Sequence, residues 1–407
     1  MAQAWHIKFQ NIDGVVKCAD CDDLMAALQQ IFLKWPFERS RSNPDIECVA
    51  EISLRDSKYS LWSIWNEDRR RFPDPIDAVC GLVAALAVGL TENSARLLNL
   101  HAAAVEFKDH VILMPATRRA GKSSLTVAMA ARGGQVLSDD FLPMDVNSCG
   151  TVLIRASGVA PRLRLPIPAE WKAPLRRFVT DLAGLESGQY RYLINDQTLA
   201  EHGRSAVPTV VVMPCRDGTS PPQLRPASSS EALKAMIHQN FGRGPTAGRT
   251  LAMLHRLVSS IPCFHLHYRA ADDAAEYLAA EGAVQLNSTN TTEADANLAA
   301  RAAKQQRVQA KSQRACTVAK DVIEYDLDGE RFVANPVSEQ IILLNPTSNS
   351  VWQLLAEGCD GVEIVELMCS AFPQVEFRQI QSDVGKIIAE FTDAGLLEVP
   401  AQTGIAE

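Results

Sequence analysis

The residues best suited to chemistry lie in one stretch, where an apolar strand at 110–114 leads into a polar loop and a helix. The loop matches the phosphate-binding Walker A pattern except at its first position, which is alanine instead of glycine. That pattern uses backbone N–H groups around a phosphate, a lysine that reaches the terminal phosphates and a hydroxyl for Mg²⁺. The candidate nucleotide contacts are Ala116, Thr117, Arg118, Arg119, Ala120, Gly121, Lys122, Ser123 and Ser124.

The helix after the loop is expected over 124–132, with its positive N-terminal end directed at the bound anion. Gly133-Gly134 would end it. Ala116 limits how closely the backbone can approach a phosphate, and Arg119 stands where a glycine often assists. An ordinary strand, turn and helix with an exposed Gly-Lys-Ser is therefore the alternative interpretation.

Two adjacent carboxylates follow the next apolar strand, at Asp139 and Asp140, and Asp139 lies 17 residues after Lys122. Such a pair repels itself unless a cation lies between the two groups. Neighbouring residues on a strand point to opposite faces, so one aspartate can face a metal ion while the other faces a substrate. A solvated turn is the alternative for this pair.

The chain of 407 residues is long enough for two or three domains, and its 47% of apolar residues is normal for globular cores. A net charge of −8 argues against a nucleic-acid partner held by bulk charge. The N-terminus has no basic segment followed by an apolar run, so no signal peptide is expected. The longest apolar run, 78–90, has 13 residues and is too short to cross a bilayer, so no membrane partner is expected.

Ten scattered cysteines are typical of reduced thiols, which predicts a cytoplasmic protein without a disulfide framework. Cys18 and Cys21 form a single CxxC pair, which either binds zinc, acts in redox chemistry or consists of two small residues at a strand end. His265 and His267 alternate on a strand and share a face. Further metal ligands do not accompany them, which favours a structural role.

Residues 1–96 are expected to form an α/β segment that packs on the nucleotide-binding region and carries no catalytic constellation. The charged segment at 68–71 (DRRR) is interpreted as a solvated turn. Hydrophobic periodicity predicts strands at 5–9, 46–54 and 59–64 and helices at 22–32 and 76–90.

The succession LHAAAV, ILMPATRRAGKSSL and VLSDD resembles the HPr serine kinase family, in particular its HPr-kinase-related members. In that family a histidine on a strand precedes the phosphate loop, and two aspartates close the strand after it. Here His101 lies 21 residues before Lys122, on a strand expected over 99–105. The resemblance implies an α/β kinase core with a fold like that of phosphoenolpyruvate carboxykinase, as a domain over 97–286.

The resemblance also implies the cofactors ATP and Mg²⁺ and a role for each site residue. Lys122 would bind the β- and γ-phosphates, and Ser123 with Asp140 would hold Mg²⁺. Asp139 would act as the general base toward a serine hydroxyl, and His101 would support the two aspartates. These roles agree with phosphoryl transfer, which depends mostly on positioning and charge neutralisation.

The signature stretch that follows in true HPr kinases is absent, so HPr itself is not the expected substrate. The sequences PRLRLP at 161–166 and QYRY at 189–192 stand in its place. A guanidinium fork suits phosphate and carboxylate groups. The candidate clamps for an anionic substrate group are therefore Arg162, Arg164 and Arg191, with ordinary surface arginines as the alternative.

The remainder of this domain is predicted to contain strands at 207–213 and 263–268 and helices at 230–240, 247–259 and 272–280. The polar stretch 287–317 is expected to be a linker. Residues 318–400 are expected to form a small winged-helix domain of three strands followed by three helices. Its hairpin signal is Asp328-Gly329, and its third strand and third helix are expected at 340–344 and 378–394.

That order, with ILLNPTSNSVWQLLAEG and a terminal GLL, resembles the PqqD-like family of recognition domains, which bind the leaders of ribosomally made, modified peptides. The resemblance implies that a leader adds a strand beside the third strand and lies against the third helix. Main-chain hydrogen bonds supply such binding. The contacts would come from Gln340, Ile341, Ile342, Leu343 and Leu344. A winged helix that binds DNA or only dimerises is the alternative, but a basic recognition helix is not visible.

Together the two resemblances predict an ATP-dependent kinase that phosphorylates a serine or threonine of a precursor peptide held by the C-terminal domain. A peptide-binding chaperone with a structural or regulatory loop is the main alternative. A phosphorylase that runs the transfer backward and a small-molecule kinase of the same fold are also open. Related kinases are oligomeric, so a homo-oligomer is one expectation.

Overall fold

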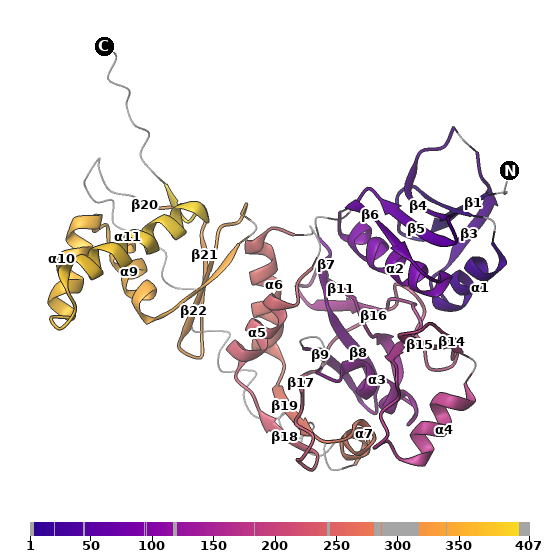
Figure 1. Ribbon diagram of the computed structural model, residues 1–407. Coiled ribbons are helices and arrows are strands. Elements are labelled where there is room, and N and C mark those ends of the chain that lie inside the picture. The colour runs from indigo at the N-terminus through magenta and orange to yellow at the C-terminus, as the bar shows by residue number, and fades with distance from the viewer. Residues whose placement is uncertain are drawn as a thin grey trace. The chain divides into compact units, whose positions relative to one another are not determined.

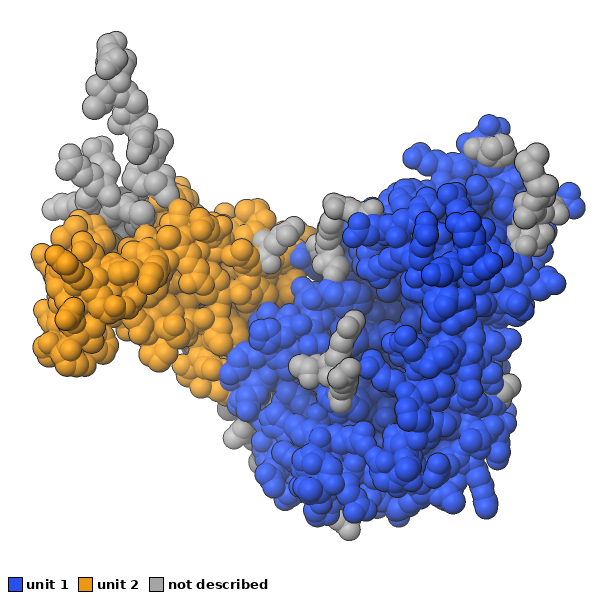
Figure 2. Space-filling view, in the orientation of Figure 1, with its two compact units in different colours: residues 1–245, 256–292 blue, residues 246–255, 293–407 orange. Residues whose placement is uncertain are grey.

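The computed structural model (Figure 1) describes residues 4–19, 21–43, 45–92, 94, 96–116, 120–182, 184–241, 245–280, 286, 317–338 and 340–398. These residues have a mixed α/β fold. The chain divides into two compact units (Figure 2). Unit 1 comprises residues 1–245 and 256–292, and unit 2 comprises residues 246–255 and 293–407.

The first sheet of unit 1 has six strands in the order β3-β1-β2-β4-β5-β6. The strands are β1 (Ala4–Phe9), β2 (Val15–Ala19), β3 (Phe37–Arg41), β4 (Cys48–Arg55), β5 (Lys58–Ser63) and β6 (Asn66–Phe72). Helices α1 (Asp22–Ile31) and α2 (Pro75–Glu92) cover one face of this sheet. The strands and helices that the sequence predicts for this segment are confirmed, with small shifts at their ends.

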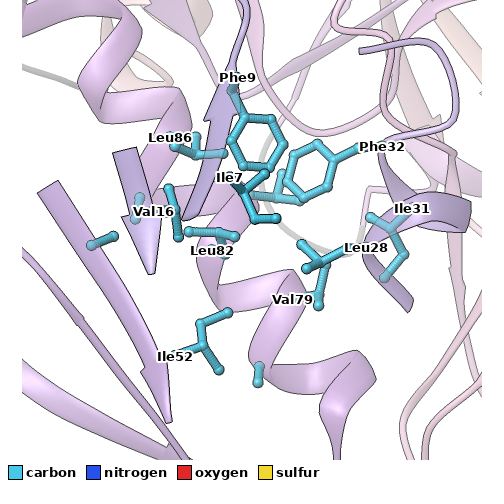
Figure 3. Close-up of a cluster of buried hydrophobic side chains, with 14 of the residues drawn as sticks. Ile7, Phe9, Val16, Leu28, Ile31, Phe32, Ile52, Val79, Leu82 and Leu86 are labelled. Atoms are coloured by element: carbon cyan, nitrogen blue, oxygen red, sulfur yellow. The ribbon is translucent and has the colours of Figure 1, made fainter. Parts of the chain in front are cut away.

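The core between this sheet and its two helices consists of apolar side chains from both (Figure 3). Ile7 and Phe9 of β1 pack with Leu28 of α1 and Leu82 of α2, and all four are at most 1% exposed. Because side chains alternate along a strand, only every second residue of β1 reaches this core. The packing fixes α2 against the sheet, and α2 also reaches the candidate site described below.

Helix α2 has 18 residues, longer than the 13-residue apolar run within it. Among the described residues it is the one helix that is long and apolar enough to cross a membrane by length and composition, with a mean hydropathy of 1.6. Of this window, 61% is buried inside the protein. Its apolar character is accounted for by the core shown in Figure 3.

The segment at 68–71 is not a turn, as its charge suggests, but part of the edge strand β6. Its three arginines, 69–71, are exposed. Strand β3, at the opposite edge, has the sequence FERSR and is also charged. Charged side chains on an edge strand discourage pairing with another chain. The charge run was interpreted wrongly because an exposed edge strand and a solvated turn share the same composition.

The second sheet also has six strands, in the order β10-β8-β9-β17-β19-β18. They are β8 (Ala102–Phe107), β9 (His110–Pro115), β10 (Gln135–Ser138), β17 (Val210–Arg216), β18 (Gln223–Pro226) and β19 (Cys263–Tyr268). Helices α3 (Lys122–Ala130) and α7 (Ala271–Ala279) share a hydrophobic core with this sheet. Strands β9, β17 and β19 are parallel, so their carboxyl ends meet at one edge, where ligands bind in α/β sheets.

The single strand expected at 99–105 is instead two strands in different sheets, β7 (Leu98–Leu100) and β8. His101 lies at the break, and its backbone N–H donates to the Gln239 carbonyl at 2.8 Å. Strand β7 pairs with β11 (Leu142–Val146), which starts two residues after Asp140. The four-stranded sheet that results, in the order β16-β12-β11-β7, is completed by β12 (Val152–Arg155) and β16 (Ser205–Ala206).

A small sheet and three more helices belong wholly or partly to unit 1. The sheet has the order β13-β15-β14, with β13 (Arg162–Arg164), β14 (Gly184–Glu186) and β15 (Tyr190–Leu193). The helices are α4 (Ala173–Asp181), α5 (Ser229–His238) and α6 (Ala247–Ser260), and the residues of α6 are divided between the two units. Ser228 and Glu231 form a capping box at the start of α5, which confirms the capped helix predicted there.

Unit 2 contains an antiparallel sheet of β21 (Ile323–Leu327), β22 (Glu330–Ala334) and β23 (Ile341–Leu344). Asp328 and Gly329 have φ of 52° and 82°, and such positive values are typical of a two-residue hairpin turn. Helices α9 (Pro346–Glu357), α10 (Gly361–Ala371) and α11 (Phe377–Asp393) follow. The order of three strands and three helices is confirmed, whereas the name winged helix stays a prediction.

A second strand pair in unit 2, β20 (Thr317–Val318) with β24 (Leu397–Glu398), was not expected from the sequence. The core of the unit is centred on Trp352, whose ring meets that of Phe391 edge-on at 5.3 Å between centroids. The linker predicted at 287–317 lies outside the described residues except for its last position.

Candidate active site

The phosphate loop connects β9 to α3, and its second half is described from Ala120 onward. Gly121 is the N-cap of α3 and has φ of 97°, in the left-handed region that favours glycine. Lys122 is 6% exposed, and its ammonium group donates to the carbonyl of Ala116, the residue that replaces the first glycine. Ser123 and Ser124 lie in the first turn of α3. The predicted loop contacts Thr117, Arg118 and Arg119 lie outside the described residues.

Tyr268 at the end of β19 restricts the loop from the other side. Its hydroxyl donates to the Ala120 carbonyl at 3.3 Å. A Cβ placed on Gly121 would collide with the same hydroxyl. Gly121 is therefore required for space as well as for its backbone conformation. Sequence reasoning missed Tyr268 because no local pattern links residue 268 to a loop near residue 121.

Asp139 lies just beyond the end of β10, not within the strand, and is 5% exposed. Its Oδ2 accepts from the backbone N–H of Arg162 at 3.2 Å, and its carboxylate also interacts with the hydroxyl of Ser123. Burial, and after it the charge of Asp140, raises the pKa of Asp139 to about 6. Its Oδ1 has no hydrogen-bond partner among the described residues.

Asp140 has a different environment, with a side chain that is 37% exposed. One carboxylate oxygen lies 3.3 Å from Nδ1 of His101, and the other accepts from the guanidinium of Arg162 at 2.7 Å. His101 thus contacts Asp140, as the break between β7 and β8 allows. The structure thus brings together His101, Asp140 and Arg162, which were predicted from three separate motifs.

Arg162 of β13 is held from several sides. Besides Asp140, its guanidinium donates to the sulfur of Cys80 on α2 and lies 4.8 Å from the ring centre of Tyr190. Burial is the largest single effect and lowers the pKa of Arg162, but Asp140, Cys80 and two tyrosines together raise it by more, so the net pKa is raised. Arg162 is therefore a fixed cation beside the carboxylates and not a solvated surface arginine.

The wall of the site includes the N-terminal segment. A cavity of about 20 Å³ adjoins Asp139 and is lined by Val83 of α2, Phe141, Ser157 and Tyr192 among others. This volume is enough for one water molecule. The expectation that residues 1–96 carry no catalytic constellation did not foresee that Val83 would line this cavity and that Cys80 would contact Arg162, because both belong to an apolar helix pattern.

The other two predicted arginine clamps have different surroundings. Arg164 is exposed, with its guanidinium 5.9 Å from the ring centre of Tyr190. Arg191 pairs with Leu163 in the ladder, so it lies on the opposite face from Arg162. Its guanidinium donates to Glu186 and to carbonyls of Val179 and Leu182, which makes it an anchor between β15 and the end of α4.

The residues at the carboxylates fit a Mg²⁺ ion. Mg²⁺ takes oxygen ligands and is usually held by one or two protein groups together with substrate phosphates. The hydroxyl of Ser123 and the unpartnered Oδ1 of Asp139 are such oxygens, next to a loop of phosphate-binding type. Among the described residues, no group of three or more His, Cys, Asp and Glu side chains is arranged to hold a metal ion on its own.

The pair Cys18 and Cys21 and the pair His265 and His267 were considered as possible metal ligands from the sequence. Cys18 is buried in the N-terminal core, and Cys21 contacts the hydroxyl of Tyr59 at 3.2 Å. His265 and His267 do share a face of β19, as predicted, with ring centres 6.3 Å apart.

The predicted peptide contacts lie at the open edge of the unit 2 sheet. In the part of the chain that the structure describes, β23 pairs with β22 on one side and with no strand on the other. Leu343 is 39% exposed, whereas Leu344 is buried in the core. Ile341 and Ile342 are partly exposed, and Gln340 precedes the strand. The edge is uncharged from Gln340 to Leu344, in contrast to the edges of the N-terminal sheet.

Residues 330–397 match the model of a protein family described as coenzyme PQQ synthesis protein D (PqqD). The match covers β22 to the start of β24 and supports the PqqD-like resemblance of this region. Among curated proteins, none matches the chain.

Two solved structures are similar to parts of the chain. One is TbiB1 in complex with the TbiA(beta) leader peptide, with 22% identity, a TM-score of 0.19, and coverage of 22% of this chain and 99% of that one. The other is the Hpr(Ser) kinase/phosphatase from Coxiella burnetii, with 11% identity, a TM-score of 0.27, and coverage of 46% of this chain and 98% of that one. Residues 330–397 of the chain are thus PqqD-like.

Proposed function

We propose that this protein is an ATP-dependent kinase that transfers the γ-phosphate to a serine or threonine hydroxyl of a ribosomally made precursor peptide. The observation that carries the proposal is the contact between the phosphate loop and the carboxylate pair. Ser123 of the loop interacts with Asp139, and Asp140 beside it is bracketed by His101 and Arg162. The nearness of the loop, the two carboxylates and a fixed arginine supports a shared role for them in phosphoryl transfer.

The chemistry follows from these groups. The loop N–H groups and Lys122 hold the terminal phosphates of ATP, and Mg²⁺, when bound, neutralises charge on the β- and γ-phosphate oxygens. One aspartate accepts the proton of the peptide hydroxyl as its oxygen attacks the γ-phosphorus. The bond from that phosphorus to the bridging oxygen breaks, and ADP leaves with the electron pair. Arg162 and Lys122 supply fixed positive charge where negative charge develops.

Peptide capture is assigned to unit 2. The open edge of β23 offers main-chain donors and acceptors to an extended peptide, and its apolar side chains offer contact area. The PqqD match supports this assignment, as does the leader peptide bound to TbiB1. A captured peptide is held at high effective concentration near a site on the same chain, which makes a weak acceptor sequence sufficient.

A non-catalytic peptide-binding protein is the second candidate. The contact between Lys122 and the Ala116 carbonyl favours it, because it satisfies the lysine within the loop. In that case the loop would be structural or regulatory, and neither aspartate would be needed for function.

Calorimetric titration of Mg·ATP into the full chain and into Lys122→Ala separates the two candidates. The kinase proposal predicts binding in the micromolar range for the wild type and loss of binding in the variant. If the wild type does not bind Mg·ATP at millimolar concentration, with or without a peptide selected on unit 2, the kinase proposal is wrong. Thermal unfolding of both proteins controls for a folding defect of the variant.

A further inference from the structure

The two aspartates differ in what each can reach, and this difference bears on their roles in the proposed kinase. The family resemblance implies that Asp139 is the base and that Asp140 holds Mg²⁺ together with Ser123. In the structure, however, the aspartate that interacts with Ser123 is Asp139. Two groups that share one cation must lie together, and Asp140 faces His101 and Arg162 instead.

The two aspartates also differ in how accessible their carboxylates are to a peptide hydroxyl. A base must come within hydrogen-bond reach of the proton it removes, and this geometry is weighed before the pKa. Asp139 is buried, with 5% of the residue exposed, and the cavity of about 20 Å³ that both aspartates line has room for about one water molecule. The side chain of Asp140 is 37% exposed. Asp140 is therefore the more accessible of the two carboxylates to an incoming serine.

The neighbours of each carboxylate are consistent with this division. The Oδ1 atom of Asp139 is buried without a hydrogen-bond partner among the described residues, as expected for an oxygen reserved for a ligand. His101 touches Asp140 through Nδ1 at 3.3 Å, the arrangement of a histidine that orients a carboxylate. Arg162 contacts both aspartates, by its backbone at Asp139 and by its guanidinium at Asp140.

We infer that the two aspartates have the reverse of the implied roles: Asp139 holds Mg²⁺ with Ser123, and Asp140 receives the proton of the peptide hydroxyl. This inference rests on the proposed kinase function and specifies its site. In the transfer step the hydroxyl proton moves to the Asp140 carboxylate, the oxygen bonds to the γ-phosphorus and ADP departs. His101 and Arg162 are then positioning residues for Asp140.

The test compares Asp139→Asn with Asp140→Asn, which make the same chemical change at adjacent positions. The measured quantity is the ratio of nucleotide Kd without divalent cation to nucleotide Kd with Mg²⁺, because this ratio cancels a general loss of affinity. Asp139→Asn should reduce the ratio about tenfold or more, the usual effect of removing a metal ligand contact. Asp140→Asn should leave the ratio within about threefold while phosphoryl transfer to a selected peptide falls about a hundredfold or more.

Titration of Mn²⁺ in the presence of ATP, followed by the electron paramagnetic resonance signal of free Mn²⁺, provides an independent readout of cation binding. Ser123→Ala combined with Asp139→Asn should weaken cation binding no more than the stronger single variant, because both groups serve one ion. If Asp140→Asn fails to fold, Asp140→Glu keeps the charge but displaces it, and should retain cation binding while losing transfer.

The outcomes separate this inference from the function on which it rests. Loss of the Mg²⁺ effect in Asp140→Asn, with Asp139→Asn unaffected, would restore the implied roles and overturn the inference while leaving the kinase intact. A wild-type protein that shows no Mg²⁺-dependent nucleotide binding would contradict the kinase proposal itself, and the inference with it.

Discussion

The guanidinium of Arg162 lies 2.7 Å from the carboxylate of Asp140, and the backbone N–H of the same arginine donates to Asp139 at 3.2 Å. One residue of β13 therefore contacts both members of the carboxylate pair. Two carboxylates this close would repel each other without a cation. Arg162 supplies that cation from a separate strand, so tertiary packing and not the local turn stabilises the pair.

Replacing Arg162 by glutamine should destabilise the protein by about 2 kcal/mol, because it leaves Asp140 without its cation in a partly buried site. The value is below that for a fully buried pair, since the Asp140 side chain is 37% exposed. Arg164→Gln is the matched control: it removes an exposed arginine of the same strand and should change stability by less than about 0.5 kcal/mol. Urea unfolding measures both, and equal effects would contradict the role given to Arg162.

The stability of the nucleotide-free, cation-free protein should depend on pH through Asp139. Its pKa is raised to about 6 in the fold, above the value near 3.9 of an unfolded chain. Because the folded state favours the protonated form, stability is fully present below about pH 4 and is lost as pH rises through 6, by up to about 3 kcal/mol.

Asp139→Asn cannot ionise, so its melting temperature should exceed that of the wild type at pH 8 and equal it near pH 4. Asp140→Asn should instead lower the melting temperature at pH 8, because it leaves Arg162 without its carboxylate. Differential scanning calorimetry at both pH values is the measurement. A lower melting temperature for Asp139→Asn at pH 8 would show that its charge is compensated in the fold.

Gly121→Ala should abolish nucleotide binding, because a Cβ there collides with the Tyr268 hydroxyl that contacts the loop. Gly133→Ala is a matched control, since Gly133 also has a positive φ, of 86°, but meets no atom within 4 Å. Both variants carry backbone strain of about 1 kcal/mol. Calorimetry with Mg·ATP should show binding in Gly133→Ala and none in Gly121→Ala; retention in both would remove Tyr268 from the description of the loop.

Leu343→Asp should weaken binding of a peptide selected from a displayed library on the full chain by about tenfold. The change places a charge on the half-exposed face of β23 and removes about 1.5 kcal/mol of apolar contact. Val337→Asp is the control, because Val337 is 83% exposed and lies in the turn before this strand. Fluorescence anisotropy measures both, and an equal loss would place the peptide elsewhere than at β23.

Much of the local structure could be predicted from the sequence. The helix that follows Gly121 and the Asp328-Gly329 hairpin depend on neighbouring residues, and their patterns are short and specific. The match of residues 330–397 to the PqqD family also agrees with the expectation for this region.

The predictions that failed depended on partners far along the chain. Strand β7 separates from β8 because it pairs with β11, some 40 residues later, and no signal near His101 announces that pairing. Cys80 and Val83 belong to a helix whose pattern indicates only burial. Arg162 and Arg191 have the same residue type on paired strands, and only the register shows that they lie on opposite faces.

The edge strands of the N-terminal sheet and of the unit 2 sheet differ in charge. At the N-terminal sheet, arginines occupy both outer strands, whereas β23 in unit 2 is uncharged and apolar. An uncharged open edge suits peptide capture, and it suits pairing with a second copy of the chain just as well. The physiological ligand would therefore also act as a solubility factor, and protein prepared without it would be prone to aggregate as its concentration rises.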